Sequence, residues 1–413
     1  MTVLARGSRG ARSEDVRRGN LSTLLRYVHV HGPTPRSTLT TVLGLNRSTI
    51  GDLTGELVAA GLVYEGAGRP DRVVDGSSGS GGRPSFVVRP ATDRVQVLAV
   101  DVGVTHLTVA RVGLGGDVLA RQDRAYRRGA RPQGDVTATI AKVGARLLVE
   151  IESDAVVVAA GVAVPGMVRR RDGQVRQAPN LGWRDAPLGA QLAEALGLPV
   201  AVGNDADLGI RAEHVRGAAA GVDDAVYLSG HSGIGAGILA GGIPLGGRAG
   251  YAGEVGHIVV EPKGLPCHCG SHGCWETQCG EERLFELAGR PAGGGLAGVR
   301  DVVRAAADGD VAARAAVEHV AGWLGRGTAN VVNALNPEIV IMGGALEEVL
   351  RAAGPTVRAE FEGAALAAPY EQVRLVIPDL GPDSTLVGAA ELAFDDLLSD
   401  PLLEMSRRTA PGA

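Results

Sequence analysis

The sequence predicts an α/β body that follows an N-terminal winged helix-turn-helix, and three observations support this fold class. From Val95 onward, short β-branched runs alternate with helical segments, as in α/β domains. Residues 19–65 instead show three helical patterns, with a tight turn at Gly44 between the second and the third. Residues 1–90 are basic, whereas the rest of the chain is acidic.

The charge is distributed unevenly along the chain. Residues 1–90 contain 12 Arg and 7 Asp or Glu, which gives +5, and the remainder contains 29 basic and 39 acidic residues, which gives −10. A basic module on an acidic body suggests that the module binds a polyanion, although a solvated basic tail, which we expect over residues 1–18, would give the same balance. No apolar run reaches the roughly 20 residues that span a bilayer, and no signal-peptide core is present, so we expect a cytoplasmic protein without a membrane partner.

Apolar spacing predicts the three helices of the N-terminal module. The first ends at Gly32-Pro33, a short second helix covers Ser37–Leu43, and the third ends at Gly61. The apolar side chains that share a face are Leu21, Leu24, Leu25 and Val28 in the first helix and Ile50, Leu53 and Leu57 in the third. The first turn of the third helix holds the candidates for contacts with DNA, Asn46, Arg47, Ser48 and Thr49. A structural three-helix bundle has the same helical pattern.

A predicted wing completes the winged helix over residues 19–89. Gly-Arg-Pro occurs at 68–70 and again at 82–84, and a Gly/Ser-rich loop separates strand-like runs at Arg72–Val74 and Ser85–Val88. Proline fixes the backbone beside the arginine, so we expect Arg83 to enter the narrow minor groove of A·T-rich DNA. A single Gly-Arg-Pro fits an ordinary turn equally well.

Glycine-rich turns in the body are candidates for binding phosphate. Asp101, Gly103 and Thr105 lie at a strand end, where backbone N–H groups can surround a phosphate while the aspartate faces Mg²⁺ through water. A second turn offers Ser232, Gly233 and Gly235, and a third offers Gly343 and Gly344, where a nucleotide base could lie against bare backbone. Each of the first two turns alone fits a plain β-turn as well.

Asp205 follows the strand-like run LPVAVGN and is a candidate general base for a substrate hydroxyl. An aspartate that caps a helix N-terminus would give the same local sequence.

All four cysteines of the chain lie between residues 267 and 279. Cys267, Cys269 and Cys274, with either His257 or Cys279, would supply the four tetrahedral ligands of a structural Zn²⁺ site. His268 and His272 compete for the fourth position, and a dithiol switch is the alternative. In a reducing compartment, clustered cysteines more often bind metal than form disulfides.

The order of these motifs resembles that of the ROK family (repressor, open reading frame, kinase) over roughly residues 19–395. EVGHIVVEPKGLPCHCGSHGCWE at 254–276 is similar to the family's signature region. Four shorter motifs fall in the family's order: NDA at 204–206, SGIGAG at 232–237, AGYAGEVGH at 249–257 and NPEIVIMGG at 336–344. The kinase members lack a winged helix, whereas the NagC/XylR-type repressors carry one with a GRPS wing, as at 82–85 here.

The resemblance implies an actin-like, hexokinase-like body of two lobes over residues 90–397, followed by a C-terminal tail at 398–413. It implies structural zinc on His257, Cys267, Cys269 and Cys274, with Cys279 as a spare thiol. The implied sugar pocket is lined by Asn180, Asn204, Asp205, Glu254, His257 and Glu276.

The first phosphate turn departs from the Asp-x-Gly-Gly-Thr of the kinase members. Val104 replaces the second glycine, and His106 stands where kinases often have Lys or another polar residue. A valine puts methyl groups where phosphate must approach, and it would be costly if the turn needed positive φ there. We therefore expect impaired binding of ATP and Mg²⁺, and Asp205 would act as a base only if kinase activity survives.

The resulting prediction is a sugar-responsive transcriptional regulator, most simply a repressor of carbohydrate-metabolism genes. A homodimer or homotetramer would bind an inverted-repeat operator in double-stranded DNA, and a sugar or sugar phosphate in the cleft would change the spacing of the winged helices. Glucose, xylose, N-acetylglucosamine and phosphorylated sugars all stay open. The alternatives are an active ATP-dependent sugar kinase that also binds DNA, and a DNA-binding protein with an inert body, against which the intact Glu254, His257 and Glu276 argue.

Overall fold

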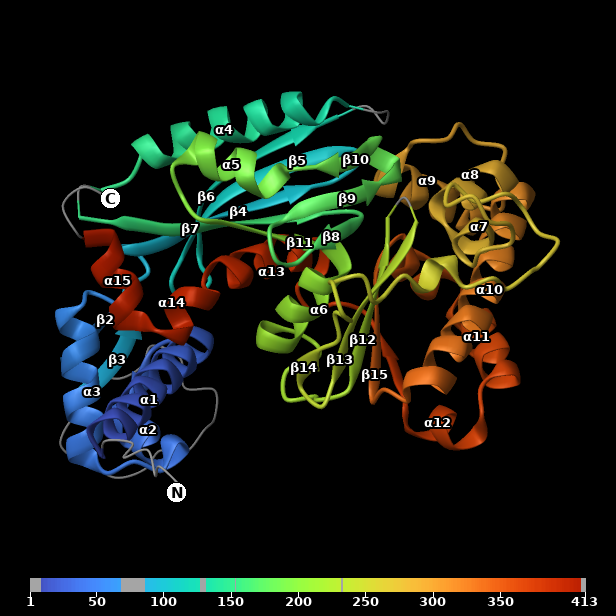
Figure 1. Ribbon diagram of the computed structural model, residues 1–413. Coiled ribbons are helices and arrows are strands. Elements are labelled where there is room, and N and C mark those ends of the chain that lie inside the picture. The colour runs from blue at the N-terminus through green and yellow to red at the C-terminus, as the bar shows by residue number, and fades with distance from the viewer. Residues whose placement is uncertain (1–8, 68–85, 127–130, 153, 232, 410–413) are drawn as a thin grey trace, which may run out of the picture.

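The computed structural model describes residues 9–67, 86–126, 131–152, 154–231 and 233–409. Its N-terminal module is a winged helix (Figure 1). The helices are α1 (Arg9–His31), α2 (Arg36–Leu43) and α3 (Arg47–Ala59), and the strands β1 (Thr34–Pro35), β2 (Val63–Ala67) and β3 (Phe86–Pro90) form a sheet of order β1-β3-β2. Gly44 takes the left-handed conformation (φ 64°) that the turn between α2 and α3 requires. The predicted strand Arg72–Val74 lies outside the described residues.

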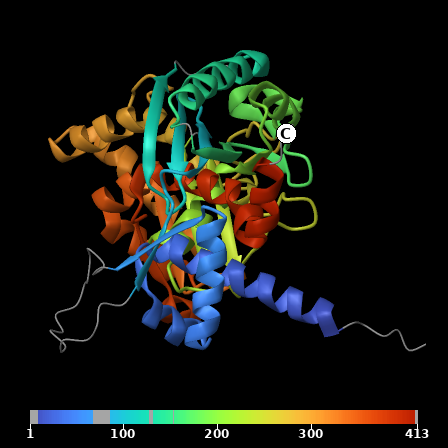
Figure 2. The same cartoon turned by 90° about the vertical axis from the view of Figure 1, so that its left-hand side faces the viewer.

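Two segments near the chain ends, residues 9–18 and 398–409, are helical in the described part of the chain. Residues 9–18, expected to be disordered, form the first turns of α1, which project away from the body (Figure 2). An ion pair between Arg18 and Asp15 and another between Arg17 and Glu56 of α3 support this helix. The disorder predicted for residues 9–18 is therefore wrong, and residues 1–8 lie outside the described part of the chain.

The predicted C-terminal tail at 398–413 is also wrong for residues 398–409. These residues belong to α14 (Asp395–Ser399) and α15 (Pro401–Thr409), in which Leu398 and Met405 are buried. The hydroxyl of Ser22 in α1 donates to the carbonyl of Leu398 at 2.6 Å. The C-terminal helices therefore join the winged helix to the body.

The first lobe of the body contains a five-stranded sheet of order β11-β7-β4-β5-β6. Its strands are β4 (Val95–Val102), β5 (His106–Gly113), β6 (Val118–Ala125), β7 (Val156–Val164) and β11 (Val200–Asn204). Strands β4, β7 and β11 are parallel, and β5 and β6 are antiparallel to their neighbours. Helices α4 (Gln133–Val149) and α5 (Leu188–Leu196) cover one face (Figure 1). A small sheet of β8 (Met167–Arg169), β9 (Gln174–Ala178) and β10 (Trp183–Ala186) extends from the lobe.

The second lobe contains a five-stranded sheet of order β14-β13-β12-β15-β16. Its strands are β12 (Ala225–Gly230), β13 (Ile234–Ala240), β14 (Ile243–Pro244), β15 (Ile339–Gly344) and β16 (Arg374–Val376). Its helices are α7 (Glu276–Cys279), α8 (Glu281–Leu287), α9 (Gly295–Ala307), α10 (Val311–Leu335), α11 (Ala345–Ala364) and α12 (Ala367–Gln372). The predicted α/β body of two lobes is confirmed.

Helices α6 (Asp205–Arg216) and α13 (Ser384–Ala393) lie between the two sheets and pack on each other (Figure 1). Gly388 permits this close approach, because a Cβ there would lie 1.9 Å from the carbonyl oxygen of Leu208. One hydrophobic core runs from the winged helix into the first lobe and includes Leu25 of α1, Leu53 of α3, Leu114 and Phe394. Within the described residues, no helix combines the length and apolar character that a membrane crossing needs.

Candidate metal centre and ligand cavities

The cysteine-containing loop, residues 256–276, folds back on itself through two isolated β-bridges. These bridges pair Val259 with Cys274 and Pro266 with His272. Gly273 is required between them, because its φ is 68° and a Cβ there would lie 1.6 Å from the carbonyl oxygen of Glu261. The fold of the loop thus brings residues that are separated in sequence to one point.

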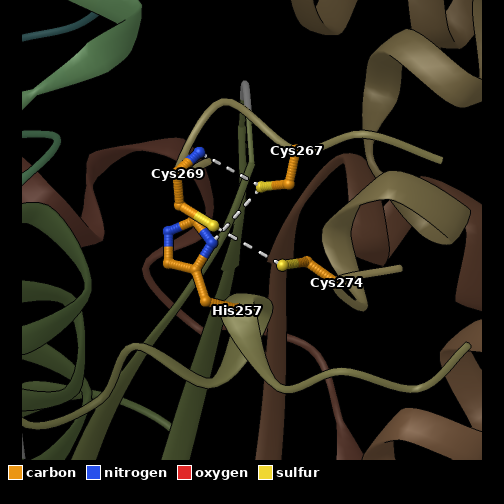
Figure 3. Close-up of side chains that lie close together, drawn as sticks. All are labelled: His257, Cys267, Cys269 and Cys274. Atoms are coloured by element: carbon orange, nitrogen blue, oxygen red, sulfur yellow. Dashed lines mark hydrogen bonds between the residues drawn. The ribbon is translucent and has the colours of Figure 1, made fainter. Parts of the chain in front are cut away.

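The side chains of His257, Cys267, Cys269 and Cys274 converge at that point (Figure 3). Their four ligand atoms all lie within 4.8 Å of one another. The Sγ atoms of Cys269 and Cys274 are 3.7 Å apart, and Sγ of Cys267 is 3.6 Å from Nδ1 of His257. A disulfide needs sulfurs about 2.05 Å apart, so Cys269 and Cys274 are two free thiols.

The spacing of these atoms fits zinc. Tetrahedral zinc with Zn–S bonds of about 2.3 Å and Zn–N bonds of about 2.0–2.1 Å separates two sulfurs by about 3.8 Å and a sulfur from a nitrogen by about 3.6 Å. The two measured distances agree with these values. The four residues predicted as ligands thus form a cluster that could hold a metal ion.

The alternative ligands lie elsewhere in the described part of the loop region. Cys279 is fully buried, its Sγ lies 3.7 Å from the carbonyl oxygen of Trp275, and burial raises the pKa of its thiol well above the ordinary value. His268 lines a neighbouring cavity, and His272 does not belong to the cluster. Cys279 thus lies outside the cluster.

Trp275 fixes the loop to the second lobe. Its indole is buried, and its Nε1–H donates to the carbonyl of Trp323 in α10 at 2.9 Å. Gly327 leaves room for the indole, because a Cβ there would lie 1.9 Å from a ring carbon. The adjacent Glu276 begins α7 and is thereby held at the metal cluster.

A cavity of about 100 Å³ lies beside this loop, and we call it the loop-side cavity. All six residues predicted for a sugar pocket line it: Asn180, Asn204, Asp205, Glu254, His257 and Glu276. Three further polar residues line it, namely Ser229, His231 and His268. The sequence did not predict Ser229 or His231, which lie next to the SGIGAG motif, and it indicated His268 only as a competing metal ligand.

The polar groups of the loop-side cavity are positioned by α6 and by the loop. The side-chain oxygen of Asn204 caps α6 by accepting the N–H groups of Ala206 and Asp207, and its amide donates to the carbonyl of Gly166 at 3.0 Å. Asp205 begins the helix, and burial raises the pKa of its carboxyl, with His231 opposing and Asp101 adding to the effect. Burial also raises the pKa of Glu254.

A second cavity of about 310 Å³, the hairpin-side cavity, lies between the lobes next to the β4–β5 turn. Asp101, Gly103, Thr105 and Gly344 line it, as predicted for a phosphate site. Gly233 and Gly235 line the loop-side cavity instead, because their turn packs against Glu276. Gly343 is buried against Tyr227, and Ser232 lies outside the described residues.

His106 occupies the turn in which phosphate was predicted to bind. Its ring lies so close to Gly103 that a Cβ on the glycine would be 2.1 Å from Cε1, and its Nε2 is 2.9 Å from Oδ2 of Asp101. This hydrogen bond raises the pKa of His106, with burial opposing it. Val104 lines the cavity but does not have the positive φ that was considered for it; among the described residues other than glycine, only Asp185 and Asn336 do.

The DNA-contact candidates of α3 lie on the surface. Arg47 and Ser48 are exposed, and Thr49 is half-buried. Asn46 is the N-cap of α3, where its Oδ1 accepts the Thr49 N–H at 2.9 Å and the Ser48 hydroxyl at 2.6 Å. Arg83 lies outside the described residues, so the structure describes only the helical part of the predicted DNA-binding surface.

Comparison with known proteins agrees with this architecture. The ROK family model matches residues 97–396. The xylose repressor of Bacillus subtilis (strain 168) is 26% identical over 383 residues, which covers 93% of this chain and 97% of the repressor.

Two solved structures extend the comparison. One is a ROK family transcriptional regulator that is a homologue of the E. coli MLC protein, with a TM-score of 0.75, 28% identity and coverage of 95% of this chain and 99% of that one. The other is a ROK family glucokinase from Streptomyces griseus in complex with glucose and AMPPNP, with a TM-score of 0.60, 30% identity and coverage of 72% and 99%. The regulator matches the winged helix and the body, whereas the glucokinase matches a smaller share of the chain. This chain belongs to the ROK family.

Proposed function

We propose that this protein is a sugar-responsive, DNA-binding transcriptional regulator that acts as a repressor of carbohydrate-metabolism genes. One contrast carries the proposal. The loop-side cavity keeps all six polar residues expected of a sugar pocket, while His106 fills the phosphate turn and pairs with Asp101. A protein that retains the ligand site and obstructs the nucleotide site is suited to sensing rather than to phosphoryl transfer.

The winged helix supplies the DNA-binding surface in this proposal. The exposed Arg47 and Ser48 at the start of α3 would enter the major groove, with Thr49 beside them and Arg83 in the minor groove. A homodimer or homotetramer would place two such helices on an inverted-repeat operator. The net charge of +5 over residues 1–90 favours the approach to phosphates.

The polar groups of the loop-side cavity favour a neutral sugar. The described residues that line it include three carboxylates, two amides and three imidazoles, but no Arg or Lys. Carboxylates and amides suit hydroxyl groups, which both donate and accept hydrogen bonds. A phosphate would meet Asp205, Glu254 and Glu276 without an arginine or lysine beside it, so we expect unphosphorylated sugars to bind more tightly than their phosphates.

We infer that Zn²⁺ is the metal of the cluster, held by His257, Cys267, Cys269 and Cys274. When bound, the zinc would serve as a structural cross-link. With Nδ1 of His257 on the metal side, its Nε2 lies 3.8 Å from a carboxylate oxygen of Glu254. The loop thereby orients two residues of the sugar pocket together.

An ATP-dependent sugar kinase that also binds DNA is the second candidate, because Asp205 lines both cavities and would lie between a sugar and a nucleotide.

Calorimetry and an ADP-release assay would distinguish the two functions. Zinc-loaded protein would be titrated with D-glucose, D-xylose, N-acetylglucosamine and the corresponding phosphates, and ADP release from Mg-ATP would be followed in parallel. We expect binding of a neutral sugar without turnover. ADP release on one sugar that disappears in Asp205→Asn would instead establish the kinase.

A further inference from the structure

Helix α6 has its two ends in different functional parts of the molecule. Its N-terminus carries Asn204 and Asp205, which line the loop-side cavity. Its last residue is Arg216, which reaches the end of α1 in the winged helix. A helix of 12 residues is about 18 Å long, so α6 spans the distance between the two regions as a single element.

A buried cluster of three charged or titratable side chains joins α6 to α1, and we call it the junction triad: His29, Arg216 and Glu391. Nε of Arg216 donates to Oε1 of Glu391 at 2.7 Å, and Nε2 of His29 lies 3.1 Å from both carboxylate oxygens. The guanidinium of Arg216 also donates to the backbone carbonyl of His29 at 3.2 Å. The side chains are only 1%, 15% and 4% exposed, in the order given.

His29 links the triad to a further backbone group. Its Nδ1 accepts the backbone N–H of Gly115 at 2.9 Å, and its Nε2 lies 3.1 Å from both carboxylate oxygens of Glu391 and 2.8 Å from Nη2 of Arg216. Burial alone would raise the pKa of Glu391, but the hydrogen bonds from His29 and Arg216 outweigh it and lower this pKa to about 2. A buried and fully paired cluster of this kind tolerates little displacement, because each lost partner leaves an uncompensated polar group.

The rest of α6 is fixed to the helix that carries Glu391. Glu213 of α6 is fully buried and accepts the N–H groups of Asp379 and Leu380 and the hydroxyl of Ser384, which begins α13. Gly388 brings the backbone of α13 against Leu208. Because α6 and α13 are joined along their length, a shift at Asp205 reaches Arg216 and Glu391 together.

We propose that α6 and the junction triad transmit occupancy of the loop-side cavity to the winged helix. Small displacements become discrete changes where packed elements have alternative arrangements. A ligand that forms hydrogen bonds with Asn204 and Asp205 displaces α6. The contacts of the junction triad at the C-terminal end of α1 then break or form again. The proposal deepens the proposed function, because the sugar is the signal it transmits.

Operator binding with and without sugar tests the transmission. The probe is whichever of D-glucose, D-xylose and N-acetylglucosamine binds in calorimetry, added to the full-length protein. In the wild type we expect operator affinity to change by about 5–150-fold on saturation. The coupling ratio is the operator affinity without sugar divided by that with saturating sugar. In Arg216→Gln we expect this ratio to lie within about twofold of one, while the affinity of the DNA-free protein for sugar changes less than about threefold. Arg216→Lys, which keeps the charge, restores part of the ratio.

A matched control separates coupling from stability. Arg18→Gln removes an ion pair with Asp400 (3.7 Å) across the same junction, together with the Asp15 pair within α1 (2.9 Å), and should leave the ratio unchanged. If sugar changes the operator affinity of Arg216→Gln as much as that of the wild type, the proposal is overturned and the triad is a purely structural contact. This holds even if the variant has a lowered melting temperature.

Hydrogen exchange provides a test that needs no sugar. Asn204→Ala removes the cap at the cavity end of α6 and should accelerate exchange of the last α1 amides, residues 27–31, by about fivefold or more in the wild type. When Asn204→Ala is added to Arg216→Gln, the exchange rate of the same α1 amides should rise by less than about twofold. Acceleration confined to the start of α6 in both backgrounds would refute the transmission. If no sugar binds, the proposed function fails while this experiment still decides the inference.

Discussion

At the residue scale, the proposed zinc site of the cysteine loop takes one corner of a tetrahedron from each of four side chains, so each should be individually necessary. Cys269 is exposed, whereas Cys267 and Cys274 are buried, so its replacement disturbs packing least. We expect Cys269→Ser to lower bound zinc from about one equivalent to below about 0.2, measured by metal analysis after dialysis. Cys279→Ser is the matched control and should keep its zinc. Stoichiometric zinc in Cys269→Ser would refute the ligand assignment.

Asp207 gives a second residue-scale prediction, on stability. Burial raises the pKa of its carboxyl from 3.8 to about 7, with Asp205 and Glu254 adding to the shift and Arg170 opposing it. The folded state therefore binds a proton that the unfolded state releases, so this group lowers stability progressively as the pH rises from about 4 to 7. Asp207→Asn should stabilise the protein by an amount on the order of 2–4 kcal/mol at pH 8 and by almost nothing at pH 4.

Denaturant unfolding at the two pH values would measure this difference. Asp308→Asn changes an exposed carboxylate and serves as the control, with an expected effect within about 0.5 kcal/mol at both pH values. Equal stabilisation by Asp207→Asn at pH 4 and pH 8 would mean that titration of the carboxyl is not the cause.

The sequence predicts which residues belong to a site better than it predicts which side chains contact one another. The four clustered side chains and the six residues of the loop-side cavity were expected from the resemblance to the ROK family, because spacing alone left the fourth metal ligand open. The position of the His106 ring over Gly103 could not be predicted, because it depends on a rotamer that spacing does not specify. The same holds for the junction triad, in which His29 and Glu391 are 362 residues apart in sequence.

At the element scale, the proposed function makes α3 the element on which DNA binding depends most. If the Arg47 side chain contacts a base, Arg47→Ala should weaken operator binding by about 1–3 kcal/mol. If it contacts a phosphate instead, the slope of log affinity against log salt concentration should decrease by about one. Fluorescence anisotropy at several salt concentrations separates the two outcomes. Arg146→Ala on α4 of the body is the control, and an affinity of Arg47→Ala equal to that of this control would contradict the assignment.

The predicted wing gives a separate element-scale test. Arg83→Ala should lower operator affinity, and the loss should be largest for operators with A·T-rich sequence beside the half-sites, because the narrow minor groove attracts arginine. Binding to matched A·T-rich and G·C-rich duplexes would measure this. Unchanged affinity on both would show that the wing does not contact DNA.

Elements with internal periodicity were predicted well, and those at the ends were not. The helices of the winged helix and the strands from Val95 onward follow their apolar patterns. The first turns of α1 and the helix α15 were missed, because they are short segments whose helical state depends on contacts with other segments, such as the Arg17–Glu56 ion pair and the packing of α15 on α14 and β7.

At the scale of the whole molecule, the winged helix is joined to the body by packing as well as by sequence. The shared hydrophobic core, the C-terminal helices and the junction triad all cross the same boundary. Helices α6 and α13 lie between the two sheets (Figure 1), and Asp205 at the start of α6 lines both cavities. This arrangement allows a ligand between the lobes to alter the position of the DNA-binding module without contacting it.

The most direct test of the account is the affinity of the full-length, zinc-loaded protein for a duplex selected from a randomised pool, measured with and without neutral sugars. The account predicts specific binding that at least one of D-glucose, D-xylose and N-acetylglucosamine changes by about 5–150-fold. It also predicts that Glu254→Gln, in the loop-side cavity, keeps the DNA binding and loses the response. An operator affinity that stays the same with every sugar at saturation would contradict it.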